Sequence, residues 1–223
     1  RKAAEGVEVR LLLDSLGSLW TRHGFLKPLQ DGGGEVAFFL PVLPVRRRWS
    51  ANLRNHRKLV VVDNKAAMVG GMNLSTLFMG PEPHPKRFID ASVLLQGPAV
   101  QDIQEIFLYD WQYATGLDRP HLEELPRPEG QPENRLVQVA PSGPDVPDDT
   151  LHDALVCAIM DAKERIWIVT PYFVPDEPLL KALAMRARMG CEVRILLPLR
   201  SNHRIPDWAR GPAMRRLHDA GAR

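Results

Sequence analysis

The sequence predicts an α/β protein of two related halves, each with a mixed β-sheet flanked by helices, the second half being incomplete. Short apolar, β-branched runs alternate with stretches whose apolar residues recur at helical spacing, as in α/β proteins. In addition, the octet GVEVRLLL that begins at Gly6 recurs as GCEVRILL at Gly190, with six of eight positions identical at an offset of 184 residues. A helix end, a glycine and a strand thus occur twice, which indicates a duplication.

The first half, residues 1–116, is expected to hold five strands and one helix. Gly6 is a typical helix stop, and a glycine-rich turn at 31–34 precedes the second strand. Asn64 and Lys65 predict a hairpin between the third strand and the fourth. Apolar residues at helical spacing predict a helix over 98–114. The strands are expected at 7–14, 36–40, 58–63, 66–70 and 88–95.

Residues 117–150 contain seven prolines between positions 120 and 147, and we interpret them as a surface connection with one strand at 135–139. The second half is expected to cover residues 151–223. Its spacing places Trp167 in the core, as it does Trp111 in the first half. The second half is expected to hold helices at 151–162 and 178–187 and strands at 165–169 and 191–198.

The amino-acid composition excludes several classes of protein. The 223 residues are 44% hydrophobic and carry a formal net charge of +2, which excludes a disordered chain and a strongly basic nucleic-acid coat. Two cysteines are too few for a disulfide framework, and no Cys/His spacing suggests a metal site. No apolar run approaches eighteen residues, so no membrane span is expected within these residues.

His56 and Lys58 stand two residues apart at the start of an expected strand, so their side chains share one face and can point at one ligand. A neutral imidazole can attack phosphorus, and an imidazolium can donate a proton. Lysine supplies a compact positive charge for a phosphate oxygen. The pair therefore predicts a site for phosphate chemistry.

Four further positions complete a pattern around this pair. Gly70 and Gly71 let the backbone approach a ligand closely, Asn73 adds a neutral donor, and Asp63 ends the strand and is expected to brace its turn. The spacing His-x-Lys, four residues, Asp, six residues, Gly-Gly-x-Asn resembles the signature of the phospholipase D superfamily. All six fixed positions match within eighteen residues.

Within that superfamily, the flanking stretches resemble bacterial cardiolipin synthases. The resemblance implies a phospholipase D-like fold and one active site between two such motifs, where one histidine forms a phosphohistidine and the other is the general acid. It implies no cofactor or metal. It also implies an acidic residue that orients the histidine, for which Asp90 is the candidate; the alternative is a carboxylate that supports a turn. The resembling stretches are LRNHRKLVVVD, GGMNLS, LQGPAVQDIQEIF, DWQYATG, TPYFVPDEPLLKAL and GCEVRILLP.

The sequence carries one copy of the complete motif, whereas the family uses two. A repeat offset of 184 would put the second histidine near position 240, so we expect a fragment of a longer protein. The second motif would then lie in the missing part of the same chain. The family's membrane anchor would lie upstream of Arg1, at the bacterial inner membrane, with the catalytic part on the cytoplasmic side.

Basic residues crowd the approach to His56, and Arg54 is the candidate among them for substrate binding. Such a run is ordinarily a solvated loop, but its place beside the motif suggests attraction to anionic phospholipid, phosphatidylglycerol by resemblance, and to a membrane surface. No nucleic acid partner is expected.

The leading functional hypothesis is a phosphatidyltransferase of the cardiolipin synthase type, which moves a phosphatidyl group between phospholipids and releases glycerol. A phosphodiesterase that gives the same intermediate to water, acting on lipid or nucleic acid, is the alternative within enzymes. A non-catalytic binding module of the same fold is the alternative outside enzymes. The motif does not separate transferase from hydrolase, because both share the first half-reaction.

Overall fold

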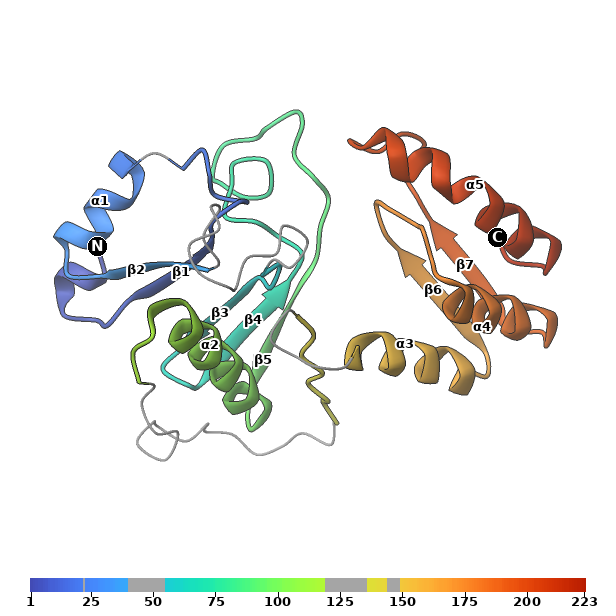
Figure 1. Cartoon of the computed structure of the whole chain (residues 1–223), viewed down its shortest axis with the longest axis horizontal. Coiled ribbons are helices and arrows are strands. Elements are labelled where there is room, and N and C mark those ends of the chain that lie inside the picture. The colour runs from blue at the N-terminus through green and yellow to red at the C-terminus, as the bar shows by residue number, and fades with distance from the viewer. Residues whose placement is uncertain (22, 40–54, 119–135, 144–148) are drawn as a thin grey trace. The chain divides into compact units, whose positions relative to one another are not determined.

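The computed structural model describes residues 1–21, 23–39, 55–118, 136–143 and 149–223. The chain divides into two compact units, Arg1–Pro147 and Asp148–Arg223 (Figure 1). Each unit combines helices with parallel or antiparallel strands, which confirms the expected α/β class.

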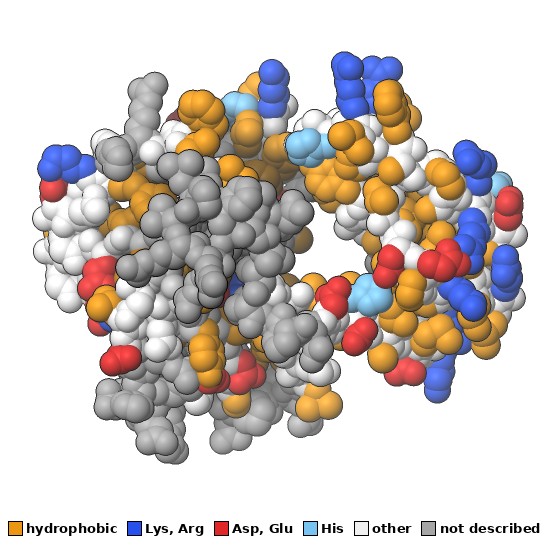
Figure 2. All heavy atoms as spheres, in the orientation of Figure 1, with side chains coloured by type: hydrophobic (Ala, Val, Ile, Leu, Met, Phe, Trp, Pro, Cys, Tyr) orange, Lys and Arg blue, Asp and Glu red, His pale blue; other side chains and the backbone are white. Residues whose placement is uncertain are grey.

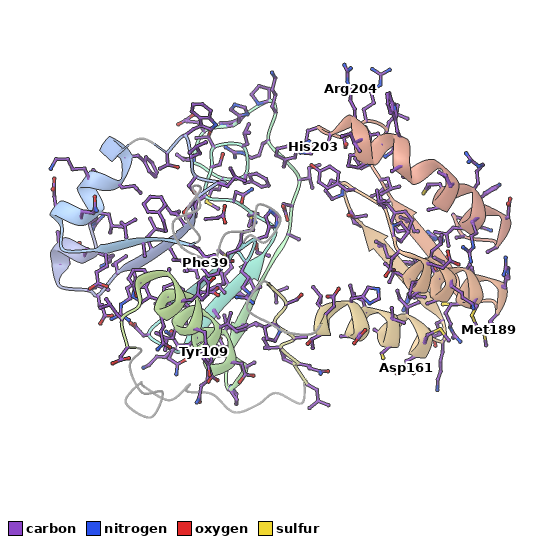
Figure 3. All side chains as sticks on the ribbon, in the orientation of Figure 1. Phe39, Tyr109, Asp161, Met189, His203 and Arg204 are labelled. Atoms are coloured by element: carbon purple, nitrogen blue, oxygen red, sulfur yellow. The ribbon has the colours of Figure 1, made fainter. Side chains whose placement is uncertain are left out.

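The first unit opens with a short 3-10 helix, η1 (Ala3–Glu5), which is followed by a strand–helix–strand element. Strand β1 (Arg10–Asp14) pairs in parallel with β2 (Glu35–Phe39), and helix α1 (His23–Asp31) connects them. The sequence did not predict α1. The side chain of Phe39 is fully buried and packs on Tyr113, with ring centroids 4.9 Å apart, which ties β2 to the next helix of this unit (Figure 3).

Three antiparallel strands follow in the order of the sequence: β3 (Leu59–Val62), β4 (Ala66–Gly70) and β5 (Ser92–Gln96). The expected hairpin between β3 and β4 is present, but its two central residues are Asp63 and Asn64 and not Asn64 and Lys65. Asp63 and Asn64 have φ values of 51° and 53°, as the two central residues of a type I′ turn require, and Lys65 N donates to Val62 O at 2.9 Å. Strand β5 begins four residues later than expected, so Asp90 lies just before it.

Helix α2 (Ala99–Thr115) lies across the three-stranded sheet (Figure 1). Its buried residues Val100 and Ile103 form a core cluster with Ala67 of β4, and Val139 of the connection packs against the same cluster. The expected strand at 135–139 is wrong for its described part, because residues 136–143 form neither helix nor strand. Val139 is held by apolar packing instead of strand pairing.

The second unit has its own core. It consists of α3 (Thr150–Asp161), β6 (Arg165–Val169), α4 (Glu177–Arg188), β7 (Glu192–Leu196) and α5 (Arg204–Asp219), with β6 and β7 parallel. Leu183 of α4 and Leu217 of α5 are almost fully buried in this core. Asp176 begins α4 by accepting a hydrogen bond from Leu179 N at 3.1 Å. Helix α5 was not expected.

The two copies of the repeated octet are used in the same way. Gly6 and Gly190 both adopt a left-handed conformation, with φ of 86° and 91°, ahead of β1 and β7. Val9 and Val193 hold equivalent places in the octets. Val9 O accepts from Glu35 N at 2.9 Å, and Val193 O accepts from Arg223 N at the same distance. The two octets are thus equivalent even in the hydrogen bond that this backbone carbonyl accepts, which supports a duplication.

Candidate active site

The motif residues His56 and Lys58 lie just before β3, at one end of the three-stranded sheet. Gly70 N donates to Lys58 O at 3.2 Å, so the pairing of β3 with β4 extends one residue past Leu59 and sets Lys58 beside Gly70. Lys58 Nζ in turn donates to His56 O at 2.8 Å. His56, Lys58 and the glycine pair are thereby brought to one end of the sheet.

Asp90 reaches the same end from the residues before β5. Gly71 N donates to Ala91 O at 3.4 Å. A Cβ atom at position 71 would lie 2.6 Å from Asp90 Oδ1 and 2.8 Å from Oδ2, so the carboxylate rests directly on the Gly71 backbone. The expectation that Asp90 lies on a strand is corrected, because it lies two residues before β5. Asp90 Oδ1 also accepts from Ala91 N at 2.7 Å.

The two glycines should respond differently to substitution by alanine. At Gly70 a Cβ would lie 2.6 Å from Ala91 O and 2.7 Å from Ser92 Cα, which are backbone atoms that cannot turn away. Gly70→Ala should therefore lower the free energy of unfolding by about 1–3 kcal/mol. Gly71→Ala meets only the end of the Asp90 side chain, so its effect on stability should be smaller. Urea unfolding of the 223-residue chain measures both; equal effects would contradict the steric argument.

Electrostatics around His56 and Lys58 involve a residue that the sequence did not single out. Desolvation lowers the pKa of His56, the charge of Lys58 lowers it further, and Asp14 opposes both. Desolvation also lowers the pKa of Lys58, against the opposing charges of Asp14 and Asp90. These effects favour a neutral imidazole, the form that can attack phosphorus.

Asp14 is the last residue of β1, and its Oδ1 atom accepts from Gly17 N at 2.7 Å. Its Oδ2 atom is buried and has no hydrogen-bond partner among the described residues. The sequence offered one signal that could have found it: the octet repeat ends just before Asp14, and the equivalent position in the second copy is Pro198. A carboxylate here therefore belongs to the first unit alone.

The other predicted site residues do not all gather at this end of the sheet. Asp63 lies in the hairpin turn at the far end of β3 from Lys58. Asn73 is exposed, two residues beyond Gly71, and its side chain makes no hydrogen bond to another described residue. Arg54 lies outside the described residues.

His84 and Lys86 repeat the two-residue spacing of His56 and Lys58. No aspartate stands five residues after Lys86, and His84 Nδ1 accepts from Lys86 N at 3.2 Å within a turn. This pair therefore lacks both the sequence and the strand setting of the motif. The described residues contain no group of three or more His, Cys, Asp or Glu that could hold a metal ion.

Comparison with known proteins decides the family. The family described as "Cardiolipin synthase, PLD-like domain" matches residues 1–111 and 155–223. The chain belongs to the cardiolipin synthase family of phospholipase D-like domains. Its match covers both units and includes His56, Lys58, Gly71 and Asp90.

Among curated members of this family, cardiolipin synthase A of Pseudomonas aeruginosa is 40% identical over 91% of this chain and 41% of its own length. Cardiolipin synthase A of Pseudomonas entomophila is 39% identical over 92% of this chain and 42% of its own length. The Clostridium perfringens cardiolipin synthase is 34% identical over 100% of this chain and 48% of its own length. The chain thus spans less than half the length of these relatives. A polyphosphate kinase from Porphyromonas gingivalis aligns with a TM-score of 0.48 at 11% identity, over 87% of this chain and 26% of that structure.

Proposed function

We propose that this chain carries one half of a phosphatidyltransferase of the cardiolipin synthase type. The observation that supports it is the grouping of His56, Lys58, Gly71 and Asp90 at one end of the sheet, in a chain whose relatives are named cardiolipin synthases. A second copy of the motif, from the rest of the same protein, supplies the other half of the site.

The proposed reaction has two displacements. His56 attacks the phosphorus of phosphatidylglycerol, an N–P bond forms, and the P–O bond to glycerol breaks as the glycerol oxygen takes a proton from the general acid. The headgroup hydroxyl of a second phosphatidylglycerol then attacks the same phosphorus. A new P–O bond forms as the N–P bond to His56 breaks, the hydroxyl proton returns to the general acid, and cardiolipin is released. Lys58 and Asn73 bind phosphate oxygens, and Asp90 orients the imidazole of His56.

The proposed partner is a membrane surface that contains anionic phospholipid, and the proposed place is the cytoplasmic side of the bacterial inner membrane. Exposed side chains at the start of α5 support this, because Trp208 is 83% exposed, Ile205 is 80% exposed and Arg204 stands next to them. Figure 3 marks Arg204 there, and Figure 2 shows hydrophobic side chains beside basic ones on this part of the second unit. Such a mixture suits the interface of an anionic bilayer. None of the described helices has the length and apolar character needed to cross a membrane.

The nucleophile is tested by trapping. The complete product of the gene that encodes this chain is mixed with phosphatidylglycerol labelled in its phosphate and quenched within one turnover. Label should be found on His56 as an acid-labile phosphohistidine, and His56→Ala should abolish it. His84→Ala is the matched control, because His84 has the same spacing to a lysine but no motif around it.

Label that survives His56→Ala at the wild-type level would exclude His56 as the nucleophile. The products separate the two enzyme classes. Cardiolipin and glycerol are expected from a transferase, whereas phosphatidic acid and glycerol would indicate that water accepts the phosphatidyl group.

A further inference from the structure

The residues on either side of His56 are both anchored to one buried carboxylate. Asn55 Nδ2 donates to Asp110 Oδ2 at 2.7 Å, and Arg57 Nη1 donates to Asp110 Oδ1 at 2.5 Å. Asp110 belongs to α2 and is only 3% exposed. The two flanks of the motif histidine thus meet at a single side chain that lies more than fifty residues away in the sequence.

Two more hydrogen bonds stiffen this arrangement. Arg57 N donates to Asn55 Oδ1 at 3.0 Å, which closes a local turn around His56. Arg57 Nη2 donates to Ser142 O at 3.1 Å, which adds a contact from the connection. The main chain from 55 to 57 is therefore held at both ends, while the His56 side chain is left exposed to solvent.

A buried carboxylate is costly unless both oxygens are paired, and here each oxygen has its own donor. Charge-assisted hydrogen bonds to a guanidinium are short and directional, so they specify position as well as contributing energy. The side chains of Asn55 and Arg57 bind Asp110 of α2. The side chain of Lys58 instead donates to His56 O, and the Lys58 carbonyl accepts from Gly70 N. Asp110 is therefore suited to fix the main chain of residues 55–57 just before it enters β3.

We propose that Asp110 is a positioning residue for the active site, which holds residues 55–57 so that the His56 imidazole is aimed at the substrate phosphorus. This inference rests on the proposed function, in which His56 is the nucleophile. Asp110 itself does not touch substrate. It acts through Asn55 and Arg57, whose side chains it binds.

The test compares Asp110→Asn with Asn55→Ala in the complete gene product. Asp110→Asn removes the charge that pairs with Arg57. Asn55→Ala removes the other link to Asp110, together with the acceptor of the Arg57 amide, while it leaves that ion pair in place. Asp102→Asn is the matched control, because Asp102 is an exposed carboxylate on the same helix. Turnover from phosphatidylglycerol, KM and hydrogen exchange of the Arg57 amide are measured for each folded variant.

We expect kcat to fall by about tenfold to a hundredfold in Asp110→Asn and Asn55→Ala with KM within about twofold, since a nucleophile displaced by about an ångström loses that much rate. The Arg57 amide should exchange faster in Asp110→Asn, although Asp110 does not bind that amide, while the α2 amides stay protected. Asp102→Asn should match the wild type in both respects.

Unchanged kcat per folded molecule, with only a lower unfolding midpoint, would overturn the proposal and leave Asp110 a structural residue. If Asp110→Asn does not fold, Asn55→Ala decides the question. If the wild-type protein forms neither phosphohistidine nor cardiolipin, the proposed function fails. The Arg57 exchange rates then still show whether Asp110 holds the segment.

Discussion

Replacing Lys58 by methionine should lower turnover of the complete gene product by about a hundredfold or more, because a preorganised charge at the phosphate is lost. The free energy of unfolding should change by about 1 kcal/mol or less, since Nζ makes one hydrogen bond, to His56 O, among the described residues. Lys86→Met is the matched control, because Lys86 stands in the same spacing to a histidine outside the motif. Near-normal turnover in Lys58→Met would remove Lys58 from the site.

The same variant has a second readout in its pH dependence. Lys58 is one cause of the lowered pKa of His56, so its removal should raise that pKa towards the ordinary value for histidine. In the proposed reaction the neutral imidazole is the nucleophile, so turnover should be lost as the pH falls through the His56 pKa. The acidic limb of kcat/KM should therefore move to higher pH in Lys58→Met. A shift to lower pH would mean that Lys58 does not act on His56 through its charge.

The 223-residue chain by itself should form cardiolipin at least about a hundredfold more slowly than full-length cardiolipin synthase A of Pseudomonas aeruginosa, assayed beside it in mixed micelles. The reason is that, in the proposed reaction, one complete motif supplies the nucleophile but no general acid for the departing glycerol oxygen. Acid assistance typically contributes a factor of about a hundred to ten thousand. Cardiolipin formation is measured together with the mass of the particle in solution.

Rapid synthesis by a monomer would contradict the requirement for two motifs. Synthesis by a dimer alone would instead indicate that two copies bring their His56 motifs together.

The secondary structure could be predicted from the local sequence pattern, except where a proline interrupts the pattern of a helix. Both missed helices contain an internal proline, Pro28 in α1 and Pro212 in α5, and proline inside a helical pattern ordinarily indicates a break. Spacing placed Trp111 in the core correctly, at 5% exposure, but wrongly placed Trp167 there, at 59%. The period of a strand shows which residues share a face, but not whether anything covers that face.

The candidate site was predictable to the extent that it depends on neighbouring strands. The motif spacing is that of a hairpin, which is why Lys58 and Gly70 become partners. The same spacing puts Asp63 about 16 Å from Lys58 along β3, at five residues of strand rise. Strand spacing alone could not find Asp14 and Asp110, because β1 and α2 reach the motif through tertiary contacts.

The alternation around His56 has a consequence for the inactive variants that can be isolated. The side chains at the odd positions 55 and 57 bind Asp110 of α2, whereas the even positions 56 and 58 hold the residues that we propose to act on the substrate. Substitutions at even positions should give well-folded but inert proteins, suitable for capturing bound lipid. Deleting a single residue within 55–58 would exchange the two sets and direct Arg57 towards the lipid. The alternation of the side chains in this segment is therefore fixed by its contact with α2. Grafting the segment into another scaffold requires a helix with an acidic side chain at the position of Asp110.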